Sequence, residues 1–308
     1  MAKISKRSYG ITIVLSILLI ISIAFNVIIY LKTNSYKNDY NNIVKELENI
    51  KSNEEEKEVS YTEVANRLEL INNIDEKITE VKNDFFTKAK ALEYKIISGE
   101  SNAKIAYLTF DDGPYYLTHK FLDVLDEYDV FATFFTIGEN KDVCYDNRSA
   151  DCSGLYLEEA KRGHTMANHT YNHGIWKGLY NSPESFIEQV KLQENLLVTR
   201  TGVKPNIVRF PGGSATAGKN KARTIELLRE NGYGWVDWSA SIGDGGSLRD
   251  YNVGWNNFVN SINSSIEVVL MHDYNKVTLE LLPAEIKYLK ENGYHIFPLF
   301  YESNKVNK

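Results

Sequence analysis

Two adjacent carboxylates, Asp111 and Asp112, follow a short apolar run in the stretch LTFDDGPYYL and precede a Gly-Pro break. Each charge resists the ionisation of its neighbour, so the pair needs a compensating positive charge. Two histidines four residues apart, His169 and His173 in NHTYNH, could hold a metal ion beside it. On a helical turn this spacing places both imidazoles on one side. Two imidazoles and a carboxylate make a three-ligand site with one open position, the pattern of catalytic zinc.

Asp112 is the natural third ligand, because a cation beside it would keep it ionised and would leave Asp111 free for another role. Near a metal-bound water, whose pKa the cation lowers, a carboxylate can act as general base. An isolated H-x-x-x-H pair is more often a surface or core pair, and an isolated Asp pair more often caps a helix or turn. Their occurrence in one chain with His272 favours a catalytic metal site.

Seven apolar or β-branched runs recur beyond residue 100, and segments with helical spacing separate most of them. The predicted strands are 104–110, 130–138, 164–169, 206–210, 233–238, 266–273 and 294–300. The predicted helices are 116–128, 183–201, 220–231, 255–263 and 278–292. Strands that alternate with helices indicate parallel β-α-β units. We therefore predict an α/β domain built as a distorted, seven-stranded (β/α) barrel, with a doubly wound open sheet as the alternative.

The side chains that could do chemistry lie at the carboxyl ends of these predicted strands. They are Asp111 and Asp112 after the first strand, His169 and His173 after the third, Arg209 on the fourth, Trp238 on the fifth and His272 on the sixth. In an α/β barrel these strand ends form one face, which is where active sites of this architecture lie. Residues that are far apart in the sequence should therefore converge on one pocket.

Five motifs occur in a fixed order. They are TFDDGP (109–114), HTYNH (169–173), RFPGG (209–213), DWSASIGDG (237–245) and LMHD (270–273). Over about residues 102–300 the chain resembles the polysaccharide deacetylases, the NodB-homology group of carbohydrate esterase family 4. The resemblance implies a metal-dependent hydrolase that removes acetyl groups from N-acetyl sugars. It also implies one divalent cation, with zinc expected first and cobalt or manganese as alternatives.

Roles follow from the resemblance at each matching position. Asp111 would be the catalytic base that activates water. The metal ligands would be Asp112, His169 and His173. Arg209 would pair with Asp111 and orient it.

The remaining roles concern the leaving amine and the substrate. His272 would be the general acid that protonates the amine, and Asp244 would tune that histidine. Leu270 would line the pocket of the acetyl methyl group, and Trp238 would wall the substrate groove. Gly212 is a departure, because the third motif usually reads R-x-P-Y-G. Its backbone N–H could still bind the oxyanion, and we expect the missing ring to change the sugar preference.

Aromatic residues near the motifs could either stack on sugar faces or pack in the core or rim. They are Tyr115, Tyr116, Tyr171, Trp176 and Tyr274. The residue types alone leave both readings open.

Residues 11–31, ITIVLSILLIISIAFNVIIYL, carry no charge over 21 residues. As a helix this stretch would be about 31 Å long, which matches a bilayer core. We expect a transmembrane anchor rather than a cleaved signal peptide, since no A-x-A site follows. Three basic residues precede the stretch and two follow it closely, which favours a cytoplasmic tail at 1–10. The chain would then be a single-pass protein of the cell membrane with its catalytic domain extracellular.

A boundary is expected near residue 99, because all six prolines and 18 of the 19 glycines lie from Gly99 onward. Residues 32–99 are rich in Lys, Glu and Asn, and their apolar residues recur at steps of three and four, which indicates a helical stalk. Self-association through a short coiled coil is the alternative. The deacetylase domain is expected at 100–302, followed by a tail at 303–308.

The net charge and the expected location of the domain limit which classes of molecule it could bind. A net charge of −6 argues against a surface that tracks phosphates, so we expect no nucleic-acid partner. An anchored extracellular domain faces the cell wall, so the expected substrate is the N-acetylglucosamine of peptidoglycan glycan strands, and the resemblance links its deacetylation to lysozyme resistance. The alternatives are muramic acid, an exopolysaccharide or chitin-like oligomers. A non-catalytic wall-binding module is the alternative from a different class.

Cys144 and Cys152 are the only cysteines, and in an exported domain they could form a loop disulfide. The absence of a C-x-x-C motif argues against a redox role.

Overall fold

The structure is a computed structural model that describes residues 86–138, 154–246 and 248–301. The predicted anchor at 11–31, the predicted stalk up to residue 85, the cysteine pair and the tail lie outside these ranges and stay predictions. Within the described ranges, no helix combines the length and the apolar composition that crossing a bilayer requires.

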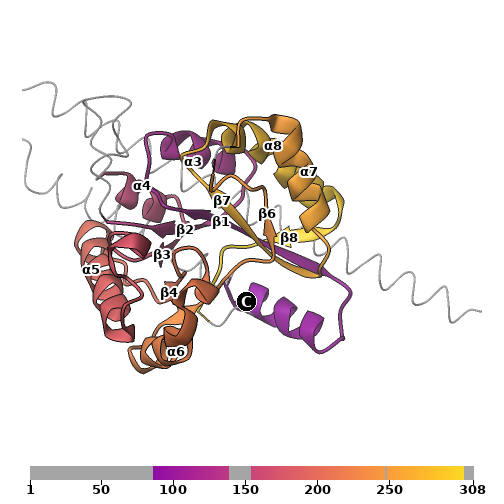
Figure 1. The fold of residues 1–308 in the computed structure, drawn as a ribbon. Coiled ribbons are helices and arrows are strands. Elements are labelled where there is room, and N and C mark those ends of the chain that lie inside the picture. Colours follow the sequence, from indigo (N-terminus) through magenta and orange to yellow (C-terminus); the bar gives the residue numbers. More distant parts are fainter. Residues whose placement is uncertain (1–85, 139–153, 247, 302–308) are drawn as a thin grey trace, which may run out of the picture. The chain divides into compact units, whose positions relative to one another are not determined.

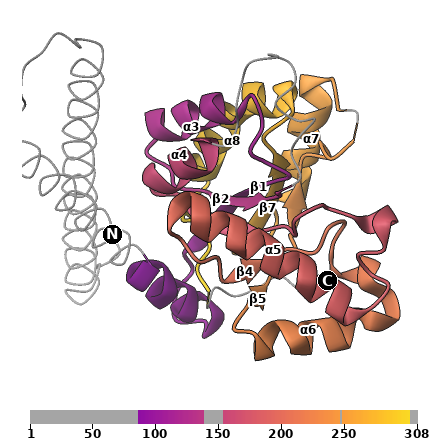
Figure 2. The same ribbon diagram turned by 90° about the vertical axis from the view of Figure 1, so that its left-hand side faces the viewer.

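A curved parallel sheet forms the centre of the domain, with helices around its outside (Figures 1 and 2). The strands are β1 (Lys104–Asp111), β2 (Thr133–Thr136), β3 (Thr165–Asn168), β4 (Ile207–Val208), β5 (Gly234–Trp235), β6 (Ala240–Ser241), β7 (Ile266–His272) and β8 (Tyr294–Ile296). The helices are α3 (Thr118–Glu127), α4 (Leu155–Lys161), α5 (Pro183–Thr201), α6 (Lys221–Glu230), α7 (Tyr251–Ser261) and α8 (Lys276–Glu291), with short 3₁₀ helices η2 (Ile175–Lys177) and η3 (Ser214–Asn220).

The strand order identifies the architecture. It runs β5-β4-β3-β2-β1-β7-β6, and β8 pairs with the first three residues of β1. The first strand therefore lies between β2 and β7, as it does in a barrel that closes on itself. In a doubly wound sheet the order would instead reverse at a central switch point. The sheet is a curled (β/α) barrel that is open between β5 and β6, and the doubly wound alternative is wrong.

Most predicted elements recur, with three differences. Strand β6, of two residues, was not predicted, because it lies beyond the end of the predicted strand at 233–238. Helix α4, which has seven residues, was not predicted either. Helix α7 begins at Tyr251 rather than at residue 255, because Asp250 caps it: the Asp250 side chain accepts a hydrogen bond from the backbone N–H of Val253 at 3.1 Å.

Alternation along β1 determines which side chains face the barrel interior. Ala106, Leu108 and Phe110 pack outward in one apolar cluster with α3 and α8. Ile105 and Tyr107 belong to the inner cluster, which also contains residues of β2, β3, β4 and β7. Because the side-chain period is two, Asp111 continues the inner row at the carboxyl end of the strand. The apolar pattern of β1 thus delivers a carboxylate to the open end of the barrel.

A helix over residues 86–97 packs against the inner cluster. Its contacts come from Phe86, Ala89, Leu92 and Ile96, and the hydroxyl of Tyr107 on β1 donates a hydrogen bond to the buried carboxylate of Glu93 at 3.1 Å. The compact unit therefore begins at Phe86 rather than at the expected boundary of residue 100.

Candidate active site

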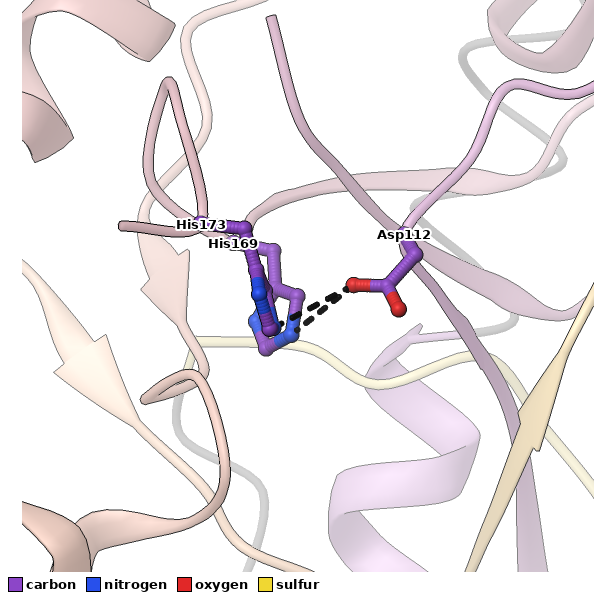
Figure 3. A group of neighbouring side chains, drawn as sticks. All are labelled: Asp112, His169 and His173. Carbon is purple, nitrogen blue, oxygen red and sulfur yellow. Dashed lines mark ion pairs between the residues drawn. The ribbon is translucent and has the colours of Figure 1, made fainter. Parts of the chain in front are cut away.

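Three predicted ligands meet at the carboxyl ends of β1 and β3. Figure 3 shows Asp112 facing both imidazoles, with its Oδ1 atom 3.5 Å from Nε2 of His169 and 3.4 Å from Nε2 of His173. One ligand atom from each residue lies within 4.8 Å of the other two. The structure therefore contains a three-residue group that could hold a metal ion.

Backbone strain is concentrated at this group. Among the described residues, four non-glycine residues have a positive φ, and three of them are Asp112 (72°), Thr170 (68°) and His173 (46°). Such conformations cost on the order of 1–3 kcal/mol each and gather at functional sites. The strained corner is held in place by the backbone N–H of Asp112, which donates to the carbonyl of Phe135 at 3.1 Å. The fold thus maintains an unfavourable backbone in order to aim these side chains.

The protonation of His169 suits a metal ligand. Burial, followed by the charge of His173, lowers the pKa of His169 to about 3, so its imidazole is neutral. Its Nδ1 atom lies 2.9 Å from the backbone carbonyl of Arg209. The N–H must therefore be on Nδ1 and donate to that carbonyl, which leaves the Nε2 lone pair pointing at Asp112.

The carboxylate of Asp112 also fits a cation. Its Oδ1 atom is buried and accepts no hydrogen bond within the described part of the chain. A buried acceptor without a partner costs about 1–3 kcal/mol, and a cation placed between Oδ1 and the two imidazoles would remove that cost. Two imidazoles and one carboxylate are a donor set that divalent zinc favours.

Asp111 is paired with a fully buried arginine. Nη1 of Arg209 donates to Oδ1 of Asp111 at 2.8 Å and to Oγ1 of Thr109 at 2.7 Å. The guanidinium carbon lies 4.1 Å from the centre of the Phe135 ring, which fixes the plane of the group. Burial raises the pKa of Asp111, whereas the Arg209 charge opposes that rise. Arg209 therefore favours the ionised carboxylate in a site that otherwise disfavours it.

Arg209 also donates hydrogen bonds to backbone carbonyls at the seam of the barrel, which is the gap between β5 and β6 where the sheet is open. Between β5 and β6 the strands do not pair, so carbonyls of the connecting segment need other donors. Nη2 of Arg209 donates to the carbonyl of Asp237 at 3.0 Å, and Nε donates to that of Val236 at 3.4 Å. The residue that contacts Asp111 is thus held by backbone carbonyls of the segment that connects β5 to β6.

His272 forms a second charged pair at the end of β7. Its Nδ1 atom lies 2.8 Å from Oδ1 of Asp244, and its backbone N–H donates to Oδ2 of Asp244 at 2.8 Å. Thr278 donates to the same Oδ2 at 2.7 Å. Burial lowers the pKa of His272, but the hydrogen bond and charge of Asp244, with smaller contributions from Asp112 and Asp111, outweigh burial and raise it to about 9. At neutral pH this imidazole is protonated, and its Nε2 lies 3.8 Å from Oδ2 of Asp112.

The sequence-predicted substrate residues surround this group. In the β1–β7 register Leu270 lies beside Thr109, and His272 lies beside Asp111, so Leu270 and His272 share the inner face. Gly212 is exposed with φ of 73°, a conformation that favours glycine. Its N–H has no acceptor among the described residues.

Trp238 packs beside the same loop. A Cβ on Gly213 would lie 3.1 Å from the Trp238 ring. The adjacent Asp237 side chain accepts from both the backbone N–H and the hydroxyl of Ser214, at 2.9 and 2.6 Å. Asp237 thereby fixes the loop that carries the free N–H of Gly212, a role that the sequence did not reveal.

Asp273 is a second residue that the sequence reasoning missed. Its carboxyl group is fully buried, and burial raises its pKa to about 7. The hydroxyl of Thr118 donates to it, while the backbone N–H of Tyr115 donates to that hydroxyl at 2.6 Å. It also lies against Gly113. These contacts connect the corner after Asp112 to the end of β7. Its place beside His272 in the LMHD motif was the available signal.

Replacing Gly113 by Ala should lower the free energy of unfolding by about 1–3 kcal/mol. The new Cβ would lie 2.5 Å from Oδ2 and 2.8 Å from Oδ1 of Asp273, a carboxyl group that Thr118 holds in place. Urea denaturation would measure the loss. Gly246→Ala is the matched control, since a Cβ at Gly246 meets no atom within 4 Å. Equal stability of the two variants would contradict the close approach.

The chain is similar to a protein family and to individual known proteins. The family model described as Polysaccharide deacetylase matches residues 98–236. A peptidoglycan-N-acetylglucosamine deacetylase of Bacillus cereus is 32% identical over 211 residues, which cover 65% of this chain and 71% of that protein. The matched range includes the Asp pair, both histidines and Arg209, whereas Asp244 and His272 lie beyond its end.

Two solved structures with a similar fold are also named as deacetylases. The catalytic domain of a peptidoglycan N-acetylglucosamine deacetylase from Eubacterium rectale has a TM-score of 0.60 at 31% identity, over 67% of this chain and 93% of that one. A polysaccharide deacetylase from Bacillus cereus has a TM-score of 0.58 at 28% identity, over 67% and 96%. The similarity covers nearly all of both solved chains.

Proposed function

The chain belongs to the polysaccharide deacetylase family, and on that premise we propose that it hydrolyses the acetamido group of N-acetylglucosamine residues in peptidoglycan. The observation that carries the proposal is the juxtaposition of three groups of different chemistry. A buried base paired with an arginine, a metal-ligand triad and a protonated histidine all meet at one end of the barrel. Oδ2 of Asp111 lies 3.5 Å from Nε2 of His169, and Nε2 of His272 lies 3.8 Å from Oδ2 of Asp112.

The cation would be held by Asp112, His169 and His173, and when bound it would polarise the amide carbonyl and lower the pKa of water. Zinc suits these ligands first, with cobalt or manganese as alternatives. Asp111 accepts a proton from the attacking water. His272 then donates a proton to the departing nitrogen, so that the C–N bond breaks and acetate and an amine are released.

Two further contacts support the reaction. The free N–H of Gly212 donates to the oxyanion that develops on the acetyl carbonyl. Leu270, on the same inner face as His272, borders the acetyl methyl group. Asp244 keeps His272 protonated until the proton is transferred to the departing nitrogen.

One comparison and one prediction from the sequence favour peptidoglycan over other polysaccharides as the substrate. Both the relative at 32% identity and the solved structure at 31% identity are named as peptidoglycan N-acetylglucosamine deacetylases. The apolar stretch at 11–31 would, as a membrane anchor, hold the domain at the outer face of the cell membrane beside the wall.

Acetate release from the purified chain tests the proposal. We expect acetate from peptidoglycan, loss of that activity after removal of metal by a chelator, and its return when zinc is added. Parallel reactions on N-acetylglucosamine oligomers and on an acetylated exopolysaccharide distinguish the alternative substrates. Metal-loaded protein that releases no acetate from any of them, or activity that survives both chelation and Asp111→Asn, would refute a metal-dependent deacetylase.

A further inference from the structure

Trp176 is exposed to an extent that aromatic side chains rarely are. Its relative exposure is 96%, whereas Trp235 is buried and Trp238 and Trp255 are partly buried in apolar clusters. The other aromatic candidates near the site behave differently. Tyr115 packs against Tyr116 and Tyr274 at ring-centroid distances of 5.1 and 5.6 Å. The indole of Trp176 thus contributes nothing to the core, and its position requires another explanation.

The turn that carries this indole is well held. Gly174 accepts hydrogen bonds from the backbone N–H groups of Lys177 and Leu179 at 2.8 and 3.1 Å, and its own N–H donates to the Asn172 side chain at 2.9 Å. Leu179 is buried in an apolar cluster and anchors the end of the turn. The exposed ring therefore stands on a fixed backbone, which reduces the entropy that a ligand must overcome on binding.

The same turn lies beside the catalytic group. Trp176 follows the metal ligand His173 by three residues, so their Cα atoms are at most about 11 Å apart. The backbone N–H of Ile175 donates to the carbonyl of His173 at 2.9 Å. The Cδ1 atom of Ile175 would lie 3.3 Å from a Cβ on Gly212. Trp176 therefore directly follows the residue that lies against Gly212, the position where this chain lacks the aromatic ring that its motif usually has.

We propose that Trp176 binds the glycan by stacking its indole face on a sugar ring adjoining the one that is deacetylated. The inference rests on the proposed function and deepens it, because it makes the substrate a chain of sugars rather than a single one. An indole is large, rigid and amphipathic, which suits the apolar face of a pyranose in water.

Protein docking explains the exposure less well. A specific protein interface needs about 800 Å² on each partner, whereas a tryptophan side chain buries about 150–250 Å². The neighbours of Trp176 do not extend the patch: Lys177 is charged and exposed, and Ile175 is half-buried. One isolated aromatic face fits one sugar ring.

Kinetics on substrates of two lengths test the inference. With the full chain, Trp176→Ala should lower the ratio of kcat/KM for an N-acetylglucosamine hexamer over that for the dimer by about 3- to 10-fold. The change should come from KM for the hexamer, and Trp176→Phe should retain part of the wild-type ratio. Tyr94→Ala is the matched control, because Tyr94 is also an exposed aromatic residue, at 66%, but lies on the helix over residues 86–97.

Tryptophan fluorescence gives a readout that does not depend on turnover. Adding the hexamer to wild-type protein should change an emission component that is absent in Trp176→Phe. A hexamer that neither changes this emission nor distinguishes Trp176→Ala from wild type in KM would overturn the role of Trp176. If the wild type releases no acetate but the hexamer changes the emission of Trp176, the deacetylase proposal fails while the sugar contact stands.

Discussion

Replacing Asp111 by Asn should lower kcat by about 10²- to 10⁴-fold while the bound metal stays at the wild-type level. An amide cannot take a proton from water, and Asp111 is not a member of the group formed by Asp112, His169 and His173. The change also leaves the buried Arg209 without its anionic partner, which should cost about 3–5 kcal/mol of stability. Activity must therefore be expressed per folded, metal-loaded molecule, with metal content measured by atomic emission.

The neighbouring substitution is the control. Asp112→Asn should mainly weaken metal binding, because it replaces the carboxylate whose Oδ1 faces both imidazoles. Added metal should restore part of its activity, whereas no metal concentration should restore Asp111→Asn. If the two variants have the same metal content, the division of roles between the adjacent carboxylates is wrong.

The position of the candidate site could be predicted because the carboxyl ends of all strands in a (β/α) barrel lie at the same end of the barrel. Side chains of strand β1 alternate between the outer and inner apolar clusters. Asp111 is an even number of residues from Ile105 and Tyr107, so its side chain faces the barrel interior as theirs do. Parallel strands then bring His169 and His272 to the same end. No packing detail is needed for that inference, which is why the sequence was sufficient to group these residues.

The support around those residues could not be predicted in the same way. The seam between β5 and β6 arises from how the sheet curls, and no periodic pattern records which carbonyls Arg209 must satisfy. Asp237 and Asp273 act through contacts with Ser214 and Thr118, which come from elements distant in the sequence. Such contacts depend on three-dimensional packing, whereas the location of the strand ends depends only on the order of the strands.

The compact unit starts at Phe86 and not at the expected boundary, for a related reason. Residues 86–97 have the same helical spacing as the segment before them, so sequence pattern assigned both to a stalk. Only the fold shows that Ala89 and Glu93 are buried against β1. A truncation at residue 100 should therefore be avoided in any functional assay, since it would remove part of the inner apolar cluster.

Asp244→Asn should shift the alkaline limb of the pH profile of kcat/KM to lower pH. His272 must be protonated to act as general acid, so activity falls as the pH rises through its pKa. Burial lowers that pKa, but Asp244, with smaller contributions from Asp112 and Asp111, raises it to about 9. Without the charge of Asp244, burial is less opposed and the pKa falls. If it fell to the ordinary value of 6.5, the protonated fraction at pH 8 would drop roughly 30-fold.

The pH at which Asp244→Asn loses most activity shows whether Asp244 sets the pKa of His272 or only holds its side chain in place. At pH 6 an imidazole of pKa 6.5 is still mostly protonated, so a loss caused by the missing charge should be much smaller there than at pH 8. Thr278→Val removes one hydrogen bond to Asp244 without changing any charge, and its profile should keep the alkaline limb of the wild type. An equal loss for Asp244→Asn at both pH values would mean that Asp244 only holds His272 in place and does not set its proton affinity.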